Sequence, residues 1–230
     1  MIILCTGIMR SGSTWSYNVA LNIIRLSNEV IHCGYVASDK LLDSIEKTPD
    51  DAVGIFKCHD PNDTIIQKIK NGEYKNIIMI RHPLDCIASR QSFAAREPLL
   101  KSVAWIQKNV DSVYKMMGGV PSLVIRYEEM IVSPLTHIRL IAAYLGYELS
   151  EEIVRVIHIN TNIEATKAFC STIKEGKGVI KENDHLIDLV TALHHNHIGN
   201  CEVGKWVREL GDRGEILKSH LVNEIKFLGY

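Results

Sequence analysis

The chain has 230 residues, of which 46% are hydrophobic and 23% charged, the balance of a folded protein rather than a disordered one. Its 26 Lys and Arg residues are offset by 27 Asp and Glu residues, for a formal net charge of -1. This balance argues against a general polyanion-binding surface, so no nucleic-acid partner is expected. A site for an anion must be built locally, from a few placed residues.

No apolar run approaches the ~20 residues that a membrane-spanning helix needs. The apolar start of the chain is too short for a secretion signal and has no basic residues before it. The six cysteines are spread out with no C-x-x-C pair, which is typical of free thiols in a reducing compartment. The sequence therefore predicts a cytoplasmic protein with no membrane partner.

Short apolar runs alternate with segments of helical periodicity through the first two thirds of the chain. Buried strands are predicted over residues 1–6, 52–56, 76–80 and 122–125. Helices are predicted over residues 15–26, 62–70, 99–117, 134–145 and 151–157, with one more beginning near Pro83. This alternation predicts an α/β fold of three layers, in which helices cover both faces of a central parallel sheet.

The last third of the chain is less regular. Residues 171–183 contain three lysines and two glycines with little apolar periodicity, which predicts an exposed, mobile loop. Residues 205–210 and 215–228 again show helical spacing. No segment has the composition of a linker, so we expect a single domain over residues 1–230.

The strongest local signal is the segment Gly7-Ile-Met-Arg-Ser-Gly-Ser-Thr14, between the first predicted strand and the first predicted helix. A glycine-bearing turn there lets backbone N–H groups converge on an anion at a helix N-terminus. Arg10 adds a full charge, and Thr14 adds a hydroxyl donor. The spacing is similar to the GxxxxGK[ST] loop of triphosphate-binding proteins, but Ser13 replaces the lysine that reaches the β- and γ-phosphates. The loop therefore favours a less charged ligand.

Four segments in order resemble motifs of the sulfotransferases that use 3′-phosphoadenosine 5′-phosphosulfate (PAPS). They are Met9-Arg-Ser-Gly-Ser-Thr-Trp15, Lys57-Cys-His59, Ile80-Arg-His-Pro-Leu-Asp-Cys-Ile-Ala-Ser89 and Arg126-Tyr-Glu-Glu-Met130. The first is similar to the family's 5′-phosphosulfate loop and the third to its 3′-phosphate element. A weaker match, His197-Ile-Gly199 with Gly204-Lys-Trp206, resembles the C-terminal loop that closes over the cofactor. The resemblance spans roughly residues 3–210 and implies a P-loop NTPase-like fold.

The resemblance also implies a nucleotide site. Its expected cofactor-binding residues are Arg10, Ser11, Gly12, Ser13, Thr14, Trp15, Arg81, Ser89, Tyr127, Thr161, His197 and Gly199. Arg10 would stabilise the 5′-phosphate as it leaves, and Arg81 with Ser89 would hold the 3′-phosphate. Trp15 would lie against the face of the adenine, and Tyr127 would reach its edge. The family's C-terminal loop often reads Arg-Lys-Gly, so this chain lacks two cations there.

The implied reaction moves a sulfuryl group from PAPS to a hydroxyl or amine, leaving adenosine 3′,5′-bisphosphate (PAP). It is an in-line displacement that depends on positioning and charge stabilisation. His59 is the expected general base, with Asp60 as the nearest alternative. Lys57, two residues from His59, shares its side of an extended chain and is expected to contact the sulfonyl group. The sulfonyl group carries less charge than a γ-phosphate, so no metal ion is required.

Other functions stay open. A P-loop small-molecule kinase would need a lysine after Gly12 and an acidic Mg²⁺ ligand at a strand end, where this chain has Arg81. A nucleotide-binding module that has lost catalysis is a third possibility. The cluster of His194, His195, His197 and Cys201 has ligand types that suit Zn²⁺, but its spacing matches no standard site, so no metal is predicted. The expected acceptor is a small molecule, bound by loops near residues 33–39, 93–99 and 171–183.

Overall fold

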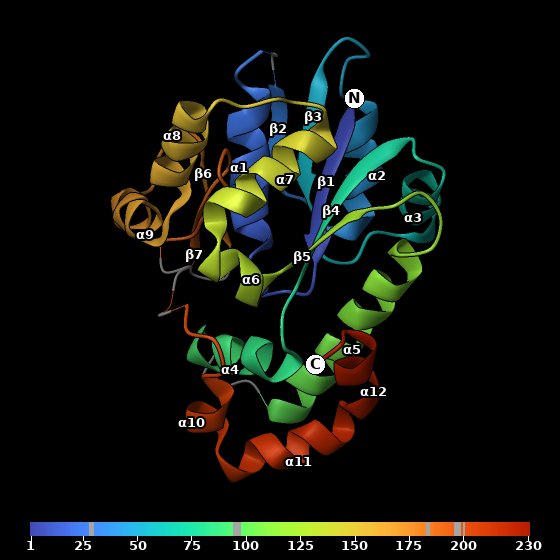
Figure 1. The fold of residues 1–230 in the computed structure, drawn as a ribbon, viewed down its shortest axis with the longest axis vertical. Helices are drawn as coiled ribbons and strands as arrows, with labels where there is room; N and C mark the ends of the chain where they lie inside the picture. Colours follow the sequence, from blue (N-terminus) through green and yellow to red (C-terminus); the bar gives the residue numbers. More distant parts are fainter. Residues whose placement is uncertain (28–29, 94–97, 183–184, 196–198, 200) are drawn as a thin grey trace.

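The computed structural model describes residues 1–27, 30–93, 98–182, 185–195, 199 and 201–230. Its centre is a five-stranded parallel sheet with the strand order β2-β3-β1-β4-β5 (Figure 1). The strands are β1 (Ile2–Gly7), β2 (Val30–Tyr35), β3 (Val53–Lys57), β4 (Tyr74–Ile80) and β5 (Leu123–Arg126). The predicted α/β fold with a central parallel sheet is therefore confirmed.

Helices cover both faces of the sheet. On one face lie α1 (Ser13–Ile24), α6 (Tyr127–Val132), α7 (Pro134–Leu145) and α8 (Glu151–Thr161). On the other lie α2 (Ser38–Glu46), α3 (Asp63–Lys70), α4 (Pro83–Phe93) and α5 (Leu99–Met116). The chain ends in α10 (Trp206–Leu210), α11 (Asp212–His220) and α12 (Val222–Phe227), which lie beside α4 and α5 at the lower end of Figure 1.

Alternation along the central strands builds two hydrophobic cores. On β1, Ile3 and Cys5 face the core under α1, whereas Leu4 faces the core under α5. On β4, Ile77 and Ile78 divide between the same two cores. A strand that is buried on both faces reads as a continuous apolar run, which is why these strands were predictable from sequence.

Strand β2 and helix α2 were not predicted. The sequence of β2, Val-Ile-His-Cys-Gly-Tyr, has a histidine and a glycine that interrupt the apolar run. The prediction of one loop over residues 171–183 is wrong for residues 171–182, the part of it that the structure describes. Helix α9 (Ile163–Thr172) enters the segment, and β6 (Val179–Glu182) pairs with β7 (His185–Asp188) in an antiparallel hairpin. The apolar side chains of this hairpin pack on a small separate core around Cys170 and Leu193.

The carboxyl ends of the strands meet at one edge of the sheet, which is where parallel α/β sheets bind ligands. Strands β1, β3, β4 and β5 end at Gly7, Lys57, Ile80 and Arg126, so the four main motifs noted in the sequence begin at this edge. Within the described ranges, no helix combines the length and apolar character needed to cross a bilayer. The described cysteines are free thiols.

Candidate functional site

The turn between β1 and α1 depends on unusual backbone angles. Gly7 has φ 118, and a Cβ atom there would lie 2.0 Å from the carbonyl oxygen of Met79, so only glycine fits. Gly12, the N-cap of α1, has φ 94. Arg10 has φ 66, a left-handed conformation that is costly for a residue with a side chain. Such strain, at the N-terminus of a helix, is typical of a site whose backbone is shaped for a ligand.

Ser11 supports this turn from behind. Its hydroxyl donates to the carbonyl groups of Ile8 and of Met79, the latter at 2.8 Å, and its N–H donates to Ile8 at 3.2 Å. Ser11 is fully buried and does not line the cavity described next. The side chain therefore ties the loop to β4, and the contact of Ser11 with a nucleotide stays a prediction.

A cavity of about 650 Å³ opens at the carboxyl edge of the sheet. It is lined by the other predicted site residues that the structure describes: Arg10, Gly12, Ser13, Thr14, Trp15, Lys57, His59, Arg81, Ser89, Tyr127, Thr161 and Gly199. His197 lies outside the described residues. None of residues 171–182 lines the cavity, whereas Phe169 of α9, Ile187 of β7 and Leu193 are among its apolar lining residues. The loop expected to form the acceptor pocket is thus replaced by a helix and a hairpin.

The cavity is strongly cationic, although the chain has a net charge of -1. Its described lining contains one carboxylate, Glu164, and six basic side chains: Arg10, Arg25, Lys57, Arg81, Arg90 and Lys205. Lys57, Arg81 and Lys205 are only 3–4% exposed. Burying a cation is unfavourable unless an anion or several acceptors compensate for the lost water. This arrangement favours an anionic ligand.

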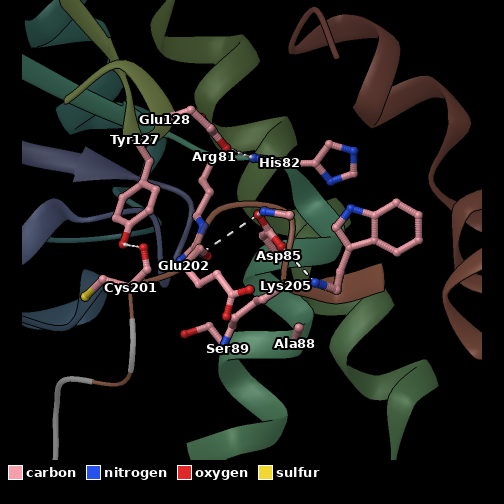
Figure 2. A network of polar contacts seen from close by, with 12 residues as sticks. Arg81, His82, Asp85, Ala88, Ser89, Tyr127, Glu128, Cys201, Glu202 and Lys205 are labelled. Atoms are coloured by element: carbon pink, nitrogen blue, oxygen red, sulfur yellow. Dashed lines mark hydrogen bonds and ion pairs between the residues drawn. The ribbon is translucent and has the colours of Figure 1, made fainter. Parts of the chain in front are cut away.

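Arg81 lies among Tyr127, Asp85 and Glu202 (Figure 2) and also contacts the backbone of Arg10. The Nε atom of Arg10 donates to Ser89 Oγ at 3.1 Å, and Nη1 of Arg81 donates to the Arg10 carbonyl at 3.2 Å. Nη2 of Arg81 donates to the Glu202 carbonyl at 2.8 Å, and its guanidinium lies over the Tyr127 ring, 4.0 Å from the ring centre. The buried Nε of Arg81 has no hydrogen-bond partner in the part of the chain that the structure describes. A donor is thus left for an anion.

Asp85 fastens the segment 201–206 onto α4. Its Oδ2 accepts a hydrogen bond from the N–H of Gly204 at 2.7 Å, and its Oδ1 accepts one from the N–H of Trp206 at 3.0 Å. The same carboxylate lies 3.8 Å from Nη2 of Arg81 and is fully buried. The carboxylate of Asp85 therefore positions both the Arg81 guanidinium and the backbone of residues 204–206.

Replacing Asp85 by alanine is expected to lower the free energy of unfolding by ~3–5 kcal/mol, because it leaves a buried guanidinium and two N–H groups without their acceptor. Urea unfolding followed by circular dichroism measures this loss. Asp111→Ala is the control: Asp111 is 59% exposed and pairs with Lys115 at 3.0 Å, so its loss should cost less than ~1 kcal/mol. Equal losses in the two variants would contradict the role given to Asp85.

The end of β3 presents Lys57 and His59 to the cavity, while Cys58 between them faces the core. The Nδ1 atom of His59 lies 2.9 Å from the carbonyl oxygen of Gly7. A carbonyl only accepts, so Nδ1 carries the proton and Nε2 keeps its lone pair. Burial, and then the positive charge of Lys57, lower the pKa of His59 to about 3. The imidazole is therefore neutral at physiological pH.

Lys57 has an unusual environment for a lysine. Burial, followed by the positive charge of Arg10, lowers its pKa to about 8. Its Nζ lies 5.4 Å from the centre of the Tyr35 ring, and that ring lies 6.0 Å from the ring of His59. Asp60, the alternative base, does not line the cavity, and its Oδ2 lies 2.6 Å from the Nζ of Lys108. His59 is thus the better placed of the two.

Several lining residues were not singled out from the sequence, among them Tyr35, Arg25 and Lys205. Tyr35 ends the unpredicted strand β2, and Lys205 was noted only within the Gly-Lys-Trp match. Among the residues that the structure describes, no group of three His, Cys, Asp or Glu side chains is arranged to hold a metal ion. One member of the histidine cluster noted in the sequence, His197, lies outside those residues.

The chain belongs to the sulfotransferase domain family, whose model matches residues 2–213. The fold is similar to that of retinol dehydratase in complex with androsterone and the inactive cofactor PAP (14% identity, TM-score 0.66, 98% of this chain and 80% of that one). It is also similar to mouse sulfotransferase SULT7A1 complexed with PAP (18%, 0.65, 98% and 83%) and to retinol dehydratase in complex with retinol and PAP (15%, 0.67, 98% and 81%). No curated protein sequence matches the chain.

Proposed function

We propose that this chain, acting as one sulfotransferase domain, transfers the sulfuryl group of PAPS to a hydroxyl or amine of a small-molecule acceptor. One observation carries the proposal: three groups of residues distant in sequence line a single cationic cavity. They are the loop after β1 with Arg10, the pair Arg81 and Ser89, and the pair Lys57 and His59. Family membership, and PAP in the similar solved structures, support the same activity.

The residues present fit a nucleotide with phosphates at both ends of its ribose. The buried Nε of Arg81 and the hydroxyl of Ser89 offer donors to a 3′-phosphate. The N-terminus of α1, with the hydroxyl of Thr14, offers donors to a 5′-phosphate. Trp15 and Thr161, which also line the cavity, are proposed to contact the adenine. Gly199 is proposed to lie over the nucleotide, together with His197.

In the proposed chemistry, Arg10 acts on the leaving phosphate, whereas Lys57 and His59 act on the sulfonyl group and the acceptor. Bound PAPS supplies a sulfuryl group on a good leaving group; its S–O bond to the 5′-phosphate breaks as the acceptor oxygen bonds to sulfur. Arg10 stabilises the charge that develops on the leaving phosphate. Lys57 holds the sulfonyl oxygens, and Nε2 of His59 takes the acceptor proton. These basic residues offset the charge of the transition state, so we propose that no metal ion is needed. We also propose a cytoplasmic location, where the free thiols stay reduced.

Ligand-induced thermal stabilisation tests the proposal first, comparing PAP with ATP–Mg²⁺. PAP at a hundred times its Kd should stabilise the fold by about 2.7 kcal/mol, whereas ATP–Mg²⁺ should have little effect. The reverse result would favour the kinase alternative. Sulfur-labelled PAPS with a panel of phenols, alcohols and amines tests turnover. Stabilisation by PAP with no label transferred to any acceptor would instead favour a binding module without catalysis.

The pH dependence of kcat/KM for PAPS provides a prediction for Lys57. Because its pKa is lowered to about 8, the ammonium of the free enzyme is charged below that pH and neutral above it. With an aliphatic alcohol as acceptor, which does not titrate, kcat/KM should fall as pH rises through about 8, well before an ordinary lysine at ~10.4 would lose its charge. Lys57→Arg, which stays charged, should abolish this alkaline limb. If Lys57→Arg showed the same alkaline limb, the limb would have to come from the titration of another group.

A further inference from the structure

Arg90 is a cation in the cavity wall with no role in the chemistry described above. It follows Ser89 on α4 and lines the same cavity as Lys57 and His59. Its guanidinium lies over the indole ring of Trp105, 4.3 Å from the ring centre. Arginine stacks on an aromatic ring through its face, whereas its N–H donors lie in the plane around its edge. The stack therefore orients the guanidinium through its face and not through the donors that recognise an anion.

Helix α4 presents different faces to its two neighbours. On one face, the carboxylate of Asp85 accepts the N–H groups of Gly204 and Trp206. On another, Arg90 contacts α5 through Trp105. Residues five apart on a helix of 3.6 residues per turn are separated by about 140° around its axis. The guanidinium of Arg90 is therefore turned away from the segment that Asp85 holds and toward α5.

The face of α5 that carries Trp105 also contacts the chain just after β3. Trp105 and Lys108 are three residues apart and so share that face of the helix. The Nζ atom of Lys108 lies 2.6 Å from Oδ2 of Asp60, the residue that follows His59. Arg90, which is stacked on this face, therefore lies on the side of the cavity that the end of β3 forms.

A second contact of α5 places Arg90 on the same side. Asn109, on the same face of α5, accepts the N–H of Met9 through Oδ1 at 3.0 Å. Met9 and Arg90 both line the cavity. They adjoin α5, whereas Trp15 and Thr161, the residues proposed to contact the adenine, belong to α1 and α8. Arg90 is therefore placed to meet the acceptor and not the nucleotide.

The charges on this side of the cavity favour an acidic acceptor over a basic one. The lining residues from β3, α4 and the segment between them include Lys57 and Arg90 but no carboxylate. The one carboxylate of the described lining, Glu164, belongs to α9. A protonated amine delivered to His59 is therefore repelled by two cations, whereas a carboxylate is attracted. Arginine binds a carboxylate through two parallel hydrogen bonds, which also fix its orientation.

We propose that Arg90 binds a carboxylate of the acceptor, so that the preferred acceptors are acidic hydroxyl compounds rather than amines. The inference rests on the proposed function and narrows its acceptor class. The acceptor places its hydroxyl at Nε2 of His59 and its carboxylate on the guanidinium of Arg90. The carboxylate takes no part in the displacement, so Arg90 selects which acceptor binds and does not act on the reacting atoms.

Three phenols that differ in one group test this with sulfur-labelled PAPS at pH 7. They are para-hydroxyphenylacetate, para-ethylphenol and para-hydroxybenzylamine, which carry a carboxylate, a methyl group and an ammonium group. For the unmodified chain, kcat/KM should be highest for the acid and lowest for the amine. Arg90→Met keeps an unbranched stem without the charge and should lower kcat/KM for the acid by roughly 10- to 100-fold, the range for a hydrogen bond to a charged group. The value for para-ethylphenol should change by less than about threefold.

Binding of PAP separates this role from one in the nucleotide site. Isothermal titration should give the same Kd for PAP in the unmodified chain and in Arg90→Met. Arg139→Met is the matched control, because Arg139 is 40% exposed and lies outside the cavity lining. It should leave kcat/KM unchanged for all three phenols. Equal losses for the acid and para-ethylphenol in Arg90→Met, or weaker binding of PAP, would overturn the inference.

A reversal of charge keeps the test decisive should Arg90→Met fail to fold. Arg90→Glu should move the preference from the acid to the amine, which a purely structural role of the stack on Trp105 does not predict. Arg90→Lys keeps the charge and should retain the preference for the acid. An unchanged order of preference in Arg90→Glu, or equal kcat/KM for the three phenols in the unmodified chain, would contradict the inference alone. Transfer to none of them, together with no stabilisation by PAP, would instead count against the proposed function itself.

Discussion

Replacement of Arg10 by alanine should lower kcat by about 10³-fold or more, the range found when an arginine that stabilises a transferring group is removed. The guanidinium lines the cavity, and its Nε donates to Ser89 Oγ at 3.1 Å. Low-dielectric surroundings strengthen its interaction with the charge that develops on the leaving group. Transfer of labelled sulfate at saturating PAPS measures the loss.

The backbone at Arg10 allows the catalytic effect to be separated from an effect on folding. Because φ is 66 there, glycine relieves a strain that alanine keeps. Arg10→Gly should be as inactive as Arg10→Ala but more stable, by ~1 kcal/mol in urea unfolding. Arg139→Ala, which removes an exposed arginine of α7 that pairs with Glu151 and does not line the cavity, should leave kcat unchanged. An Arg10→Ala variant that kept a tenth of the activity would remove Arg10 from the proposed mechanism.

The parts of the fold that the sequence predicted are those in which burial alone determines the pattern. Strands β1, β3 and β4 lie inside the sheet and contain long apolar runs, and the edge strand β5 keeps the apolar run Leu-Val-Ile. Strand β2, at the other edge, has His32 and Gly34 in its sequence, which breaks the apolar pattern. The hairpin of β6 and β7 lies outside the main sheet and rests on a small core of its own, so its lysines read as a loop.

The candidate site likewise contains residues that the sequence predicted and residues that it did not. Arg10 and Arg81 follow strand ends, and Lys57 is the last residue of β3. Parallel strands bring their carboxyl ends together at one edge of the sheet, independently of the loop sequences. Lys205 reaches the cavity only because Asp85 binds the backbone on either side of it. That contact joins residues more than a hundred positions apart and leaves no local pattern. Ser11, by contrast, belongs to the motif after β1, but its hydroxyl points into the protein and donates to the Met79 carbonyl on β4. That contact cannot be read from the motif alone.

The second large effect on kcat is expected when the imidazole of His59 is removed. His59→Ala should lower kcat by ~10²- to 10⁴-fold with little change in PAP affinity, because a general base acts on the acceptor proton and not on the nucleotide. The Gly7 carbonyl holds the proton on Nδ1, which leaves Nε2 as the acceptor. Asp60→Ala is the comparison, since the carboxylate faces Lys108 rather than the cavity; it should change kcat by less than about twofold.

The lowered pKa of His59 also predicts how the free energy of unfolding depends on pH, which can be measured without a substrate. The imidazole is neutral in the folded protein down to about pH 3, whereas an unfolded histidine gains a proton near pH 6.5. Between these values the unfolded chain binds more protons, so the free energy of unfolding falls as pH falls from about 6.5 toward 3. His59→Ala should lose part of this acid dependence. A base whose proton-accepting nitrogen is kept neutral by burial would also keep kcat/KM level as pH falls through 6.5, whereas a solvent-exposed histidine would impose an acid limb there.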